Sequence, residues 1–425
     1  MRSFEMTSSG AKAQYRPAVP RRGSLIVPGL FFLFVLFPFT QLVPLATYNQ
    51  PYAILMAAIV LLGIPNMFML LPQVDRIMLS YLAILGGVLF LAAATQGLRF
   101  REISFLISYL TPLLTTVVCY WVMSRYREMA MRMMIISICV WVSVGLIQSL
   151  GFPNFLTAFA SHSDDLGSNI LASGRGTISL APEPTHFGFH ILLLGTSLYL
   201  LRGPLWGVAL ALGAMLVLAK SSSALLALAL GIIVWGCVRP LLRIWIFAGI
   251  AALLLFSAVI PLLFDDSYRI TKIILAAYYS GFDIFLVDYS INSRLSGMFA
   301  PFYLFQSQAM MPLGMKLESW AVVREHMLAQ FSWIINLSGS GPASGVGLVL
   351  LQGGILGVPV VLYILNRFIL TLGRKPEGAL TAACFWIFMA QFYMAAPTFG
   401  LVLASIILRN QERLVVPETV SSEHK

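Results

Sequence analysis

Charged residues are scarce in this chain. Only 10% of its 425 residues are Asp, Glu, Lys or Arg, whereas 59% are hydrophobic, and the mean hydropathy is +0.87. A soluble protein of this length needs a more polar surface, so the composition excludes that class and indicates an integral membrane protein. In a soluble protein the net charge of +10 would suggest nucleic acid, but in a membrane protein the position of each basic residue decides its meaning.

Cysteine is also scarce, and several common signatures are missing. The four cysteines, Cys119, Cys139, Cys237 and Cys384, all fall within or at the ends of apolar stretches. We therefore expect packing residues and no disulfide framework. The first apolar stretch is of spanning length and lacks a clear small-residue cleavage site, so no cleavable signal peptide is expected. No repetition of one half of the chain by the other is visible.

Long apolar stretches are what the chain has in abundance. An open strand cannot satisfy its backbone in lipid, so each stretch is expected to be a helix. The last is short and could be half of a re-entrant pair. The stretches lie at 24–47, 52–72, 77–95, 103–123, 133–151, 186–201, 204–219, 221–238, 242–263, 342–365, 379–396 and 398–409.

The basic residues predict how these helices are oriented. With the N-terminus in the cytoplasm, 18 of the 27 lysines and arginines fall on the inner side and 9 on the outer side. This bias follows the positive-inside rule and supports an all-α polytopic membrane protein of about 12 transmembrane helices with both termini inside. The basic excess is then a topology signal, and nucleic acid is not an expected partner.

This topology divides the chain into seven segments and turns two long loops outward. The predicted segments are a cytoplasmic tail at 1–23, transmembrane helices 1–5 at 24–151, an outer loop at 152–185, helices 6–9 at 186–263, a large outer loop at 264–340, helices 10–12 at 341–409 and a cytoplasmic tail at 410–425.

The first outer loop ends in a motif suited to phosphate and proton chemistry. Pro184 fits the first turn of a helix, which would place Glu183 at the positive end of the helix dipole. Arg175 lies eight residues upstream of Glu183, and its planar fork matches phosphate geometry. Glu183 could act as a general base toward a sugar hydroxyl. In the alternative interpretation, Glu183 only caps the helix and Arg175 faces solvent or lipid headgroups.

Two histidines follow this motif on one helix face. With Glu183, His186 and His190 make E-x-x-H-x-x-x-H, but the spacing suggests no third or fourth ligand, so no metal site is predicted. His186 is shallow enough to reach the site, whereas His190 is expected to be a hydrogen-bonded structural residue. Lys220, followed by three serines at 221–223, sits at the outer end between two spans, where it could pair with an anionic substrate or simply snorkel.

The second outer loop carries three further candidates. Arg294 lies in a polar turn and could bind phosphate or sugar, or face solvent. Residues 317–336 show an apolar stripe at helical spacing and predict a helix. Arg324 and His326 are two positions apart on it, so a straight helix points them about 200° apart and they cannot both face one site. His326 could be a catalytic or orienting residue or only an interfacial polar one.

These features resemble the bacterial O-antigen polymerases and O-antigen ligases. The many spans with one shorter and one much longer outer loop match the plan of that superfamily. Arg175, Ser179 and the Glu-Pro-Thr at 183–185 are similar to its R-x-x-S-x-x-x-E-P-S/T pattern, although three residues instead of two separate Arg175 from Ser179. The small-residue stretch at 220–224 is similar to a Ser-Arg-Ser segment of that family.

The resemblance implies a fold, an activity and a location. It implies a GT-C-like, metal-independent glycosyltransferase of the bacterial inner membrane that needs no cofactor and no nucleotide sugar. The donor would be an oligosaccharide on undecaprenyl diphosphate, and the partners would include membrane lipid, a chain-length regulator and a flippase. Polymerases join lipid-linked repeat units into O-antigen or exopolysaccharide, whereas ligases pass the glycan to lipid A-core.

The family's residue roles carry over to matching positions. Arg175 and Arg294 would hold the diphosphate, assisted by Lys220 and Arg324. Glu183 would serve the acceptor hydroxyl with His186 beside it, and His326 could match a loop histidine of the ligases. Polymerase loops often show an arginine followed at fixed spacing by glycine, and here the nearest later glycine, Gly188, departs from that pattern. The Glu-Pro-Thr stretch favours a polymerase, and a ligase stays the alternative.

Two other classes compete with an enzyme. A transporter of lipid-linked glycan would place polar residues at the bilayer midplane and often shows inverted repeats, whereas the charges here lie at span ends and in outer loops. A structural subunit would not need Arg and Glu beside a Glu-Pro-Thr turn.

Overall fold

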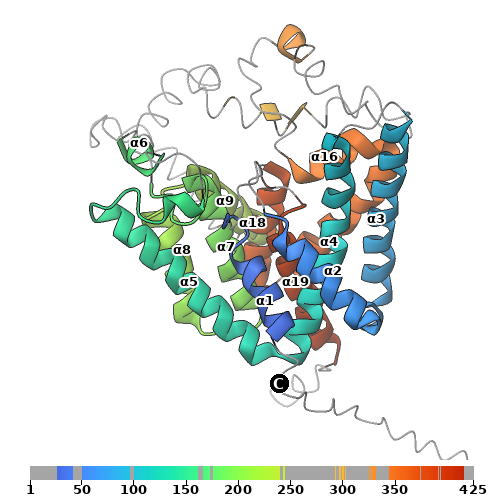
Figure 1. The fold of residues 1–425 in the computed structure, drawn as a ribbon, viewed down its shortest axis with the longest axis horizontal. Coiled ribbons are helices and arrows are strands. Elements are labelled where there is room, and N and C mark those ends of the chain that lie inside the picture. Colours follow the sequence, from blue (N-terminus) through green and yellow to red (C-terminus); the bar gives the residue numbers. More distant parts are fainter. Residues whose placement is uncertain are drawn as a thin grey trace, which may run out of the picture.

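A computed structural model describes most of the helical part of the chain (Figure 1). The described residues are 26–41, 50–95, 100–160, 166–172, 176–239, 243–244, 292, 296–297, 299–300, 302, 325, 327–331, 344–373, 375–390, 392 and 394–415. Every regular element within them is a helix, as predicted for an all-α protein.

In chain order, the described helices are α1 Ile26–Leu36, α2 Tyr52–Gly63, α3 Gln73–Ala94, α4 Phe100–Arg125, α5 Arg127–Ser149, α6 Leu166–Ala172, α7 Pro184–Leu200, α8 Leu205–Val217, α9 Ser222–Cys237, α16 Gly345–Gly353, α17 Val358–Leu365, α18 Glu377–Ala390 and α19 Pro397–Val415. Most of the residues between α9 and α16 lie outside the described part. Short 3-10 turns occur at Pro65–Leu70, Thr157–Phe159 and Gly354–Gly357, and a π-helical turn at Asn366–Leu370.

Four helical stretches in the described part are long and apolar enough to cross a membrane. They are Gln73–Ala92, Ile107–Arg125, Arg127–Ser149 and Gly345–Leu370. The apolar helices α1, α2, α8, α9 and α18 are shorter. The last predicted span, 398–409, lies in a longer helix, because α19 continues through a polar turn to Val415. The span predicted at 242–263 lies outside the described residues, except for 243–244.

The first helix is much shorter than its apolar stretch suggested. A continuous helix was expected over 24–47, but α1 ends at Leu36, two residues before Pro38. A proline has no N–H to donate and disfavours helical geometry in the residue before it, so the helix stops there. Eleven residues rise only about 16 Å, roughly half of a hydrocarbon core. The chain therefore enters the bundle as a helix and continues as irregular backbone.

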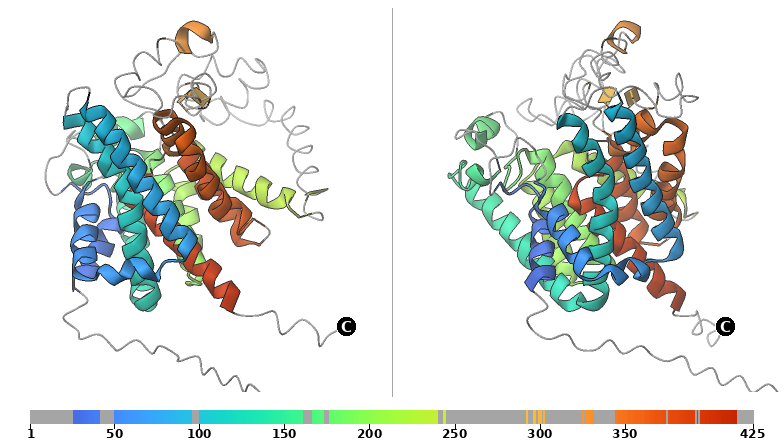
Figure 2. Two further views of the ribbon diagram at one scale, coloured as in Figure 1. Left: turned by 90° about the vertical axis from the view of Figure 1, so that its right-hand side faces the viewer. Right: turned by 45° about the vertical axis from the view of Figure 1, so that its right-hand side comes forward.

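The helices pack side by side in one bundle, in which α19 contacts α1, α4 and α7, and α18 packs against α9 (Figures 1 and 2). Small residues allow the closest approaches. A Cβ on Gly400 would lie 2.1 Å from the Thr115 hydroxyl, and a Cβ on Gly231 would lie 2.3 Å from the Ala379 carbonyl oxygen. Close packing through small residues is how helices associate in lipid, where burial of apolar surface gives little drive.

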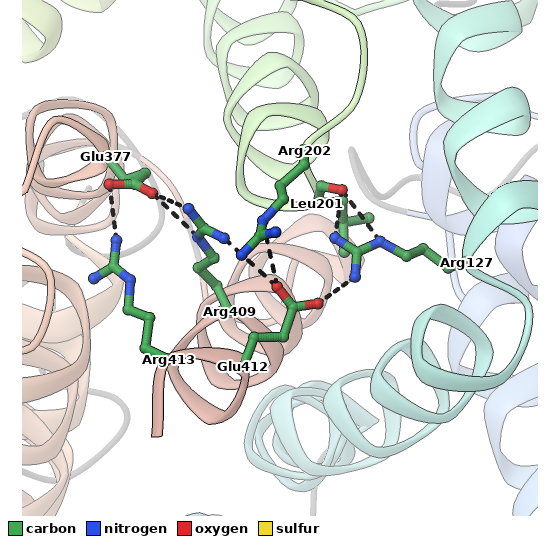
Figure 3. Close-up of polar contacts among 7 residues, drawn as sticks. All are labelled: Arg127, Leu201, Arg202, Glu377, Arg409, Glu412 and Arg413. Carbon is green, nitrogen blue, oxygen red and sulfur yellow. Dashed lines mark hydrogen bonds and ion pairs between the residues drawn. The ribbon is translucent and has the colours of Figure 1, made fainter. Parts of the chain in front are cut away.

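Charged side chains gather at one end of the bundle (Figure 3). We call this group the arginine cluster; its members are Arg127, Arg202, Glu377, Arg409, Glu412 and Arg413. They come from the start of α5, the α7–α8 turn, the start of α18 and the last turns of α19. All four arginines belong to the set that the positive-inside rule assigned to one side, so the structure brings together residues that the topology had grouped.

A separate buried ion pair joins α3 to the π-helical turn after α17. Arg367 lies 2.8 Å from one carboxylate oxygen of Asp75 and donates to the other at 3.0 Å. The Tyr363 hydroxyl donates to the same carboxylate at 2.7 Å. The side chain of Asp75 is almost completely buried, so its charge depends on these two partners.

Candidate functional site

The candidate site is built on irregular backbone that leads into α7. Residues 176–182 are all buried, yet they form no helix or strand. Non-helical backbone can lie inside a membrane protein only where protein or a water-filled cavity satisfies its polar groups. This segment is therefore costly to maintain, and its hydrogen bonds identify which helices hold it.

Gln148, near the end of α5, clamps the middle of the segment. Its side-chain oxygen accepts from the Ser179 N–H at 2.7 Å, and its side-chain nitrogen donates to the Ser179 carbonyl at 3.0 Å and to the Phe155 carbonyl at 2.9 Å. The Ser179 hydroxyl donates to the Trp141 carbonyl at 2.6 Å. Ser179 has a φ of 52°, a left-handed conformation that a serine adopts only at a cost.

The turn between α8 and α9, residues 218–221, lies against the same segment. The Thr177 N–H donates to the Leu218 carbonyl at 2.9 Å. A Cβ on Gly176 would lie 2.2 Å from the Ala219 carbonyl oxygen, and a Cβ on Gly188 would lie 2.8 Å from the Cβ of Ser221. The turn thus contacts the chain both before and after the Glu-Pro-Thr stretch.

Lys220 is displayed by this turn. It is exposed and has a φ of 45°, so the backbone again takes a left-handed conformation at a residue that is not glycine. Ser221 then caps α9 by accepting from the Ala224 N–H at 3.3 Å. The sequence predicted that Lys220 lies in a turn between two helices. It did not indicate that this turn packs against residues 176–188, as the structure shows.

Glu183 has the position that the sequence predicted. It is the N-cap of α7, with Pro184 at the first helical position. Its backbone is extended, and its side chain is half-buried and makes no capping hydrogen bond to the helix. Simple side-chain capping therefore does not account for this carboxylate. The carboxylate lies at the N-terminal end of α7.

His186 and His190 lie one turn apart with different surroundings. The His186 ring is half-buried between Phe39 and Phe392, with centroids 5.8 and 6.2 Å away. His190 is fully buried, and its Nε2 donates to the Leu36 carbonyl at 2.9 Å, since a carbonyl can only accept. The prediction that His190 is a hydrogen-bonded structural residue is confirmed; the carbonyl it satisfies belongs to the end of α1.

Four of the predicted site residues lie outside the described residues: Arg175, Arg294, Arg324 and His326. Arg175 directly precedes Gly176 in the sequence. Of the helix predicted over 317–336, residues 325 and 327–330 are helical and the others lie outside the described part, except Phe331, which follows the helix. Among the described residues, no group of three or more His, Cys, Asp or Glu could hold a metal ion.

Sequence reasoning missed Gln148, Phe39 and Phe392. Gln148 had a readable signal, because it is a polar residue inside an apolar span and must find partners there. No sequence signal identified Phe39 and Phe392, because aromatic residues are frequent throughout this chain. Which of them lie beside His186 is known only from the fold.

What the described site offers chemically is a half-buried carboxylate at a helix N-terminus, an imidazole one turn away and an exposed lysine on an adjacent turn. No protein-family model matches the chain, and no curated protein is significantly similar to it.

Proposed function

We propose that this chain is an inner-membrane glycosyltransferase that polymerises oligosaccharide units carried on undecaprenyl diphosphate. The observation that carries the proposal is the convergence of two separate motifs: residues 176–188, with the Glu-Pro-Thr stretch, pack against the turn that displays Lys220. The membrane character is supported by the four long apolar helices. The twelve-span, GT-C-like arrangement is part of the proposal.

The proposed topology puts Glu183 on the outer face and the arginine cluster in the cytoplasm. Support comes from α7, which begins after Glu183 and ends at Leu200, just before Arg202. Its 17 residues rise about 25 Å, close to the thickness of a hydrocarbon core. The carboxylate and the arginine cluster thus lie at opposite ends of one helix. Both termini are then cytoplasmic, and the loops 152–185 and 264–340 face the periplasm.

In the proposed reaction, the hydroxyl of one lipid-linked unit attacks the anomeric carbon of another. Glu183 takes the hydroxyl proton as the new glycosidic bond forms, with His186 beside it. The bond from the anomeric carbon to the diphosphate breaks with inversion. Arg175, Arg294 and Lys220 stabilise the negative charge that collects on the leaving diphosphate, and either Arg324 or His326 of the large loop completes the site, since one helix cannot direct both at it.

The magnitude of the arginine contribution follows from known preorganised donors. Removing one such donor raises a barrier by about 3–4 kcal/mol, equivalent to a rate loss on the order of 10²–10³. Arg175→Ala and Arg294→Ala should each shorten the glycan strongly. Unchanged glycan length in both variants would remove the arginines from the mechanism.

The test is a lipid-glycan gel of a deletion strain complemented with wild type, Glu183→Gln or the control Glu128→Gln. Glu128 is an exposed carboxylate at the arginine-cluster end of α5. If the protein is a polymerase, the Glu183→Gln strain should carry lipopolysaccharide capped with a single repeat, or lipid-linked single units in place of secreted polymer. The Glu128→Gln strain should make normal polymer. Long undecaprenyl-linked chains that never reach lipid A-core would identify a ligase instead.

One observation favours a transporter of lipid-linked glycan as the second candidate. Transporters bind substrate at interrupted helices, and α1 stops inside the bundle with its last carbonyl held by Trp141 at 3.2 Å and by His190. A transporter predicts that lipid-linked units accumulate on the cytoplasmic leaflet in the deletion strain. Accumulation on the periplasmic leaflet supports the glycosyltransferase.

A further inference from the structure

The arginine cluster carries more positive charge than its acidic members neutralise. It holds four arginines and two glutamates. Glu412 forms an ion pair with Arg127 and lies 3.5 Å from Arg409 and 3.8 Å from Arg202. Glu377 is shared by Arg409 and by Arg413, which lies 2.8 Å away. Both carboxylates are already shared, so two positive charges stay uncompensated within the cluster.

Arg127 is committed to holding the α7–α8 turn in place. Its Nε and one terminal nitrogen donate to the Leu201 carbonyl at 3.2 and 2.6 Å, and its other terminal nitrogen bonds Glu412. Leu201 is the C-cap of α7, where the helix dipole favours a cation. These bonds use three of the five N–H donors of Arg127 and fix the turn that carries Arg202.

Arg202 is different, because it is exposed and only loosely paired among the described residues. Its side chain is 63% exposed, and the one ionic contact that it makes within the described part of the chain, to Glu412, is 3.8 Å long. A guanidinium offers five N–H donors. Its backbone has a φ of 58° directly after the α7 cap, a position that glycine usually fills because it carries no steric cost there. The backbone cost of an arginine at this position is consistent with a role for its side chain.

The surface next to Arg202 is apolar and exposed. Leu205 and Trp206, the first residues of α8, are 68% and 56% exposed. Tryptophan is enriched where a membrane meets water, since its ring is apolar and its N–H is polar. The exposed side chains of Arg202, Leu205 and Trp206 thus lie within five consecutive residues at one end of the bundle.

We propose that Arg202 binds the phosphate of an anionic phospholipid whose acyl chain lies against Leu205 and Trp206. The net positive charge of the arginine cluster strengthens the attraction between Arg202 and the phosphate. The exposed Leu205 and Trp206 favour a lipid over a free anion or an acidic protein segment, because only a lipid has an acyl chain to contact them. Basic sites between transmembrane helices on the cytoplasmic side recognise anionic headgroups in this way. The site lies at the opposite end of α7 from Glu183, so it does not depend on the proposed glycosyltransferase.

The test uses the purified full-length chain in dodecyl maltoside micelles. Binding of palmitoyl-oleoyl-phosphatidylglycerol is measured by native mass spectrometry, with palmitoyl-oleoyl-phosphatidylcholine as the neutral comparison. One basic residue contributes about 1 kcal/mol to attraction by anionic lipid, so Arg202→Gln should weaken phosphatidylglycerol binding about five-fold. The matched control is Arg132→Gln, because Arg132 is 72% exposed on α5 and pairs with the exposed Glu128 one turn away.

Arg202→Gly separates binding from folding. Glycine suits the left-handed backbone, so this variant should unfold at a higher temperature than Arg202→Gln while losing phosphatidylglycerol to the same extent. Equal loss in Arg132→Gln, equal binding of phosphatidylcholine, or unchanged binding in Arg202→Gly overturns the proposal. Competition by inorganic phosphate at equal concentration would show a free-anion site and overturn the lipid assignment.

Discussion

The clamp formed by Gln148 gives a direct way to loosen the candidate site without touching a charged residue. Gln148→Met keeps the length and volume of the side chain but removes its three hydrogen bonds. The Ser179 N–H, the Ser179 carbonyl and the Phe155 carbonyl then lose this partner. Ser179 is completely buried, so water cannot replace the two bonds to its backbone.

The expected cost follows from the number and burial of these bonds. Hydrogen bonds in helical membrane proteins are worth about 0.6–1.7 kcal/mol each. A buried backbone group left without a partner costs about 1–3 kcal/mol. With two such groups on one buried residue, we expect Gln148→Met to lower the free energy of unfolding by about 3 kcal/mol.

The measurement is unfolding by dodecyl sulfate in dodecyl maltoside micelles, followed by tryptophan fluorescence. The matched control is Gln352→Met on α16, because Gln352 is also buried but, among the described residues, accepts one hydrogen bond, from the buried Tyr109 hydroxyl at 2.8 Å. That change leaves one buried group without this partner instead of two, so it should cost about half as much, about 1.5 kcal/mol. Polymer length on lipid-glycan gels should fall for Gln148→Met and stay normal for Gln352→Met.

Equal destabilisation by the two substitutions would show that the two bonds to the Ser179 backbone do not stabilise the fold more than the single bond to Tyr109. If Gln148→Met is destabilised as expected but still makes polymer of normal length, the backbone of residues 176–182 is not needed for polymerisation. A loss of polymer with unchanged stability would show that Gln148 acts on the substrate and not on the backbone.

Three further substitutions test other parts of the structure. Gly176→Ala should destabilise by about 1–3 kcal/mol, because its Cβ would overlap the α8–α9 turn; Gly213→Ala, with open space at its Cβ, should be neutral in the same unfolding assay. Glu412→Gln should cost about 1–3 kcal/mol, and Glu128→Gln, from an exposed pair, less than about 0.5 kcal/mol; equal values would contradict the cluster's role. Asp75→Asn should cost about 3–5 kcal/mol by leaving a buried arginine unpaired, and a milder loss on denaturation would show that this pair is solvated.

Much of the helical framework was predictable from the sequence. The spans expected at 77–95, 103–123 and 133–151 correspond to α3, α4 and α5, each longer by several residues at one or both ends. The observed helices include polar residues that a hydropathy criterion leaves out, such as Gln73 and Arg127. The prediction of a continuous helix over 24–47 was wrong. Pro38 indicated a break in this stretch, but the prediction followed the apolar composition instead.

The candidate site was predictable only as separate pieces. The positions of Glu183 and Pro184 could be predicted from the local sequence alone. A proline favours the first position of a helix, and the residue before a proline favours extended backbone. The bond between Gln148 and Ser179 joins residues 31 positions apart, and Arg127 meets Glu412 across 285 positions. Such pairings depend on helix packing, which one sequence does not specify.

The most direct measurement is the product made by the purified protein from an undecaprenyl-diphosphate-linked oligosaccharide in proteoliposomes. A polymerase with Glu183 as its base should make a ladder of lipid-linked polymers as wild type and as Glu128→Gln. Glu183→Gln should leave only the single unit, although it unfolds at the wild-type dodecyl sulfate concentration. A polymer ladder from Glu183→Gln that matches the wild-type ladder would contradict the proposed role of this carboxylate, and no polymer from any form would contradict the proposed polymerase.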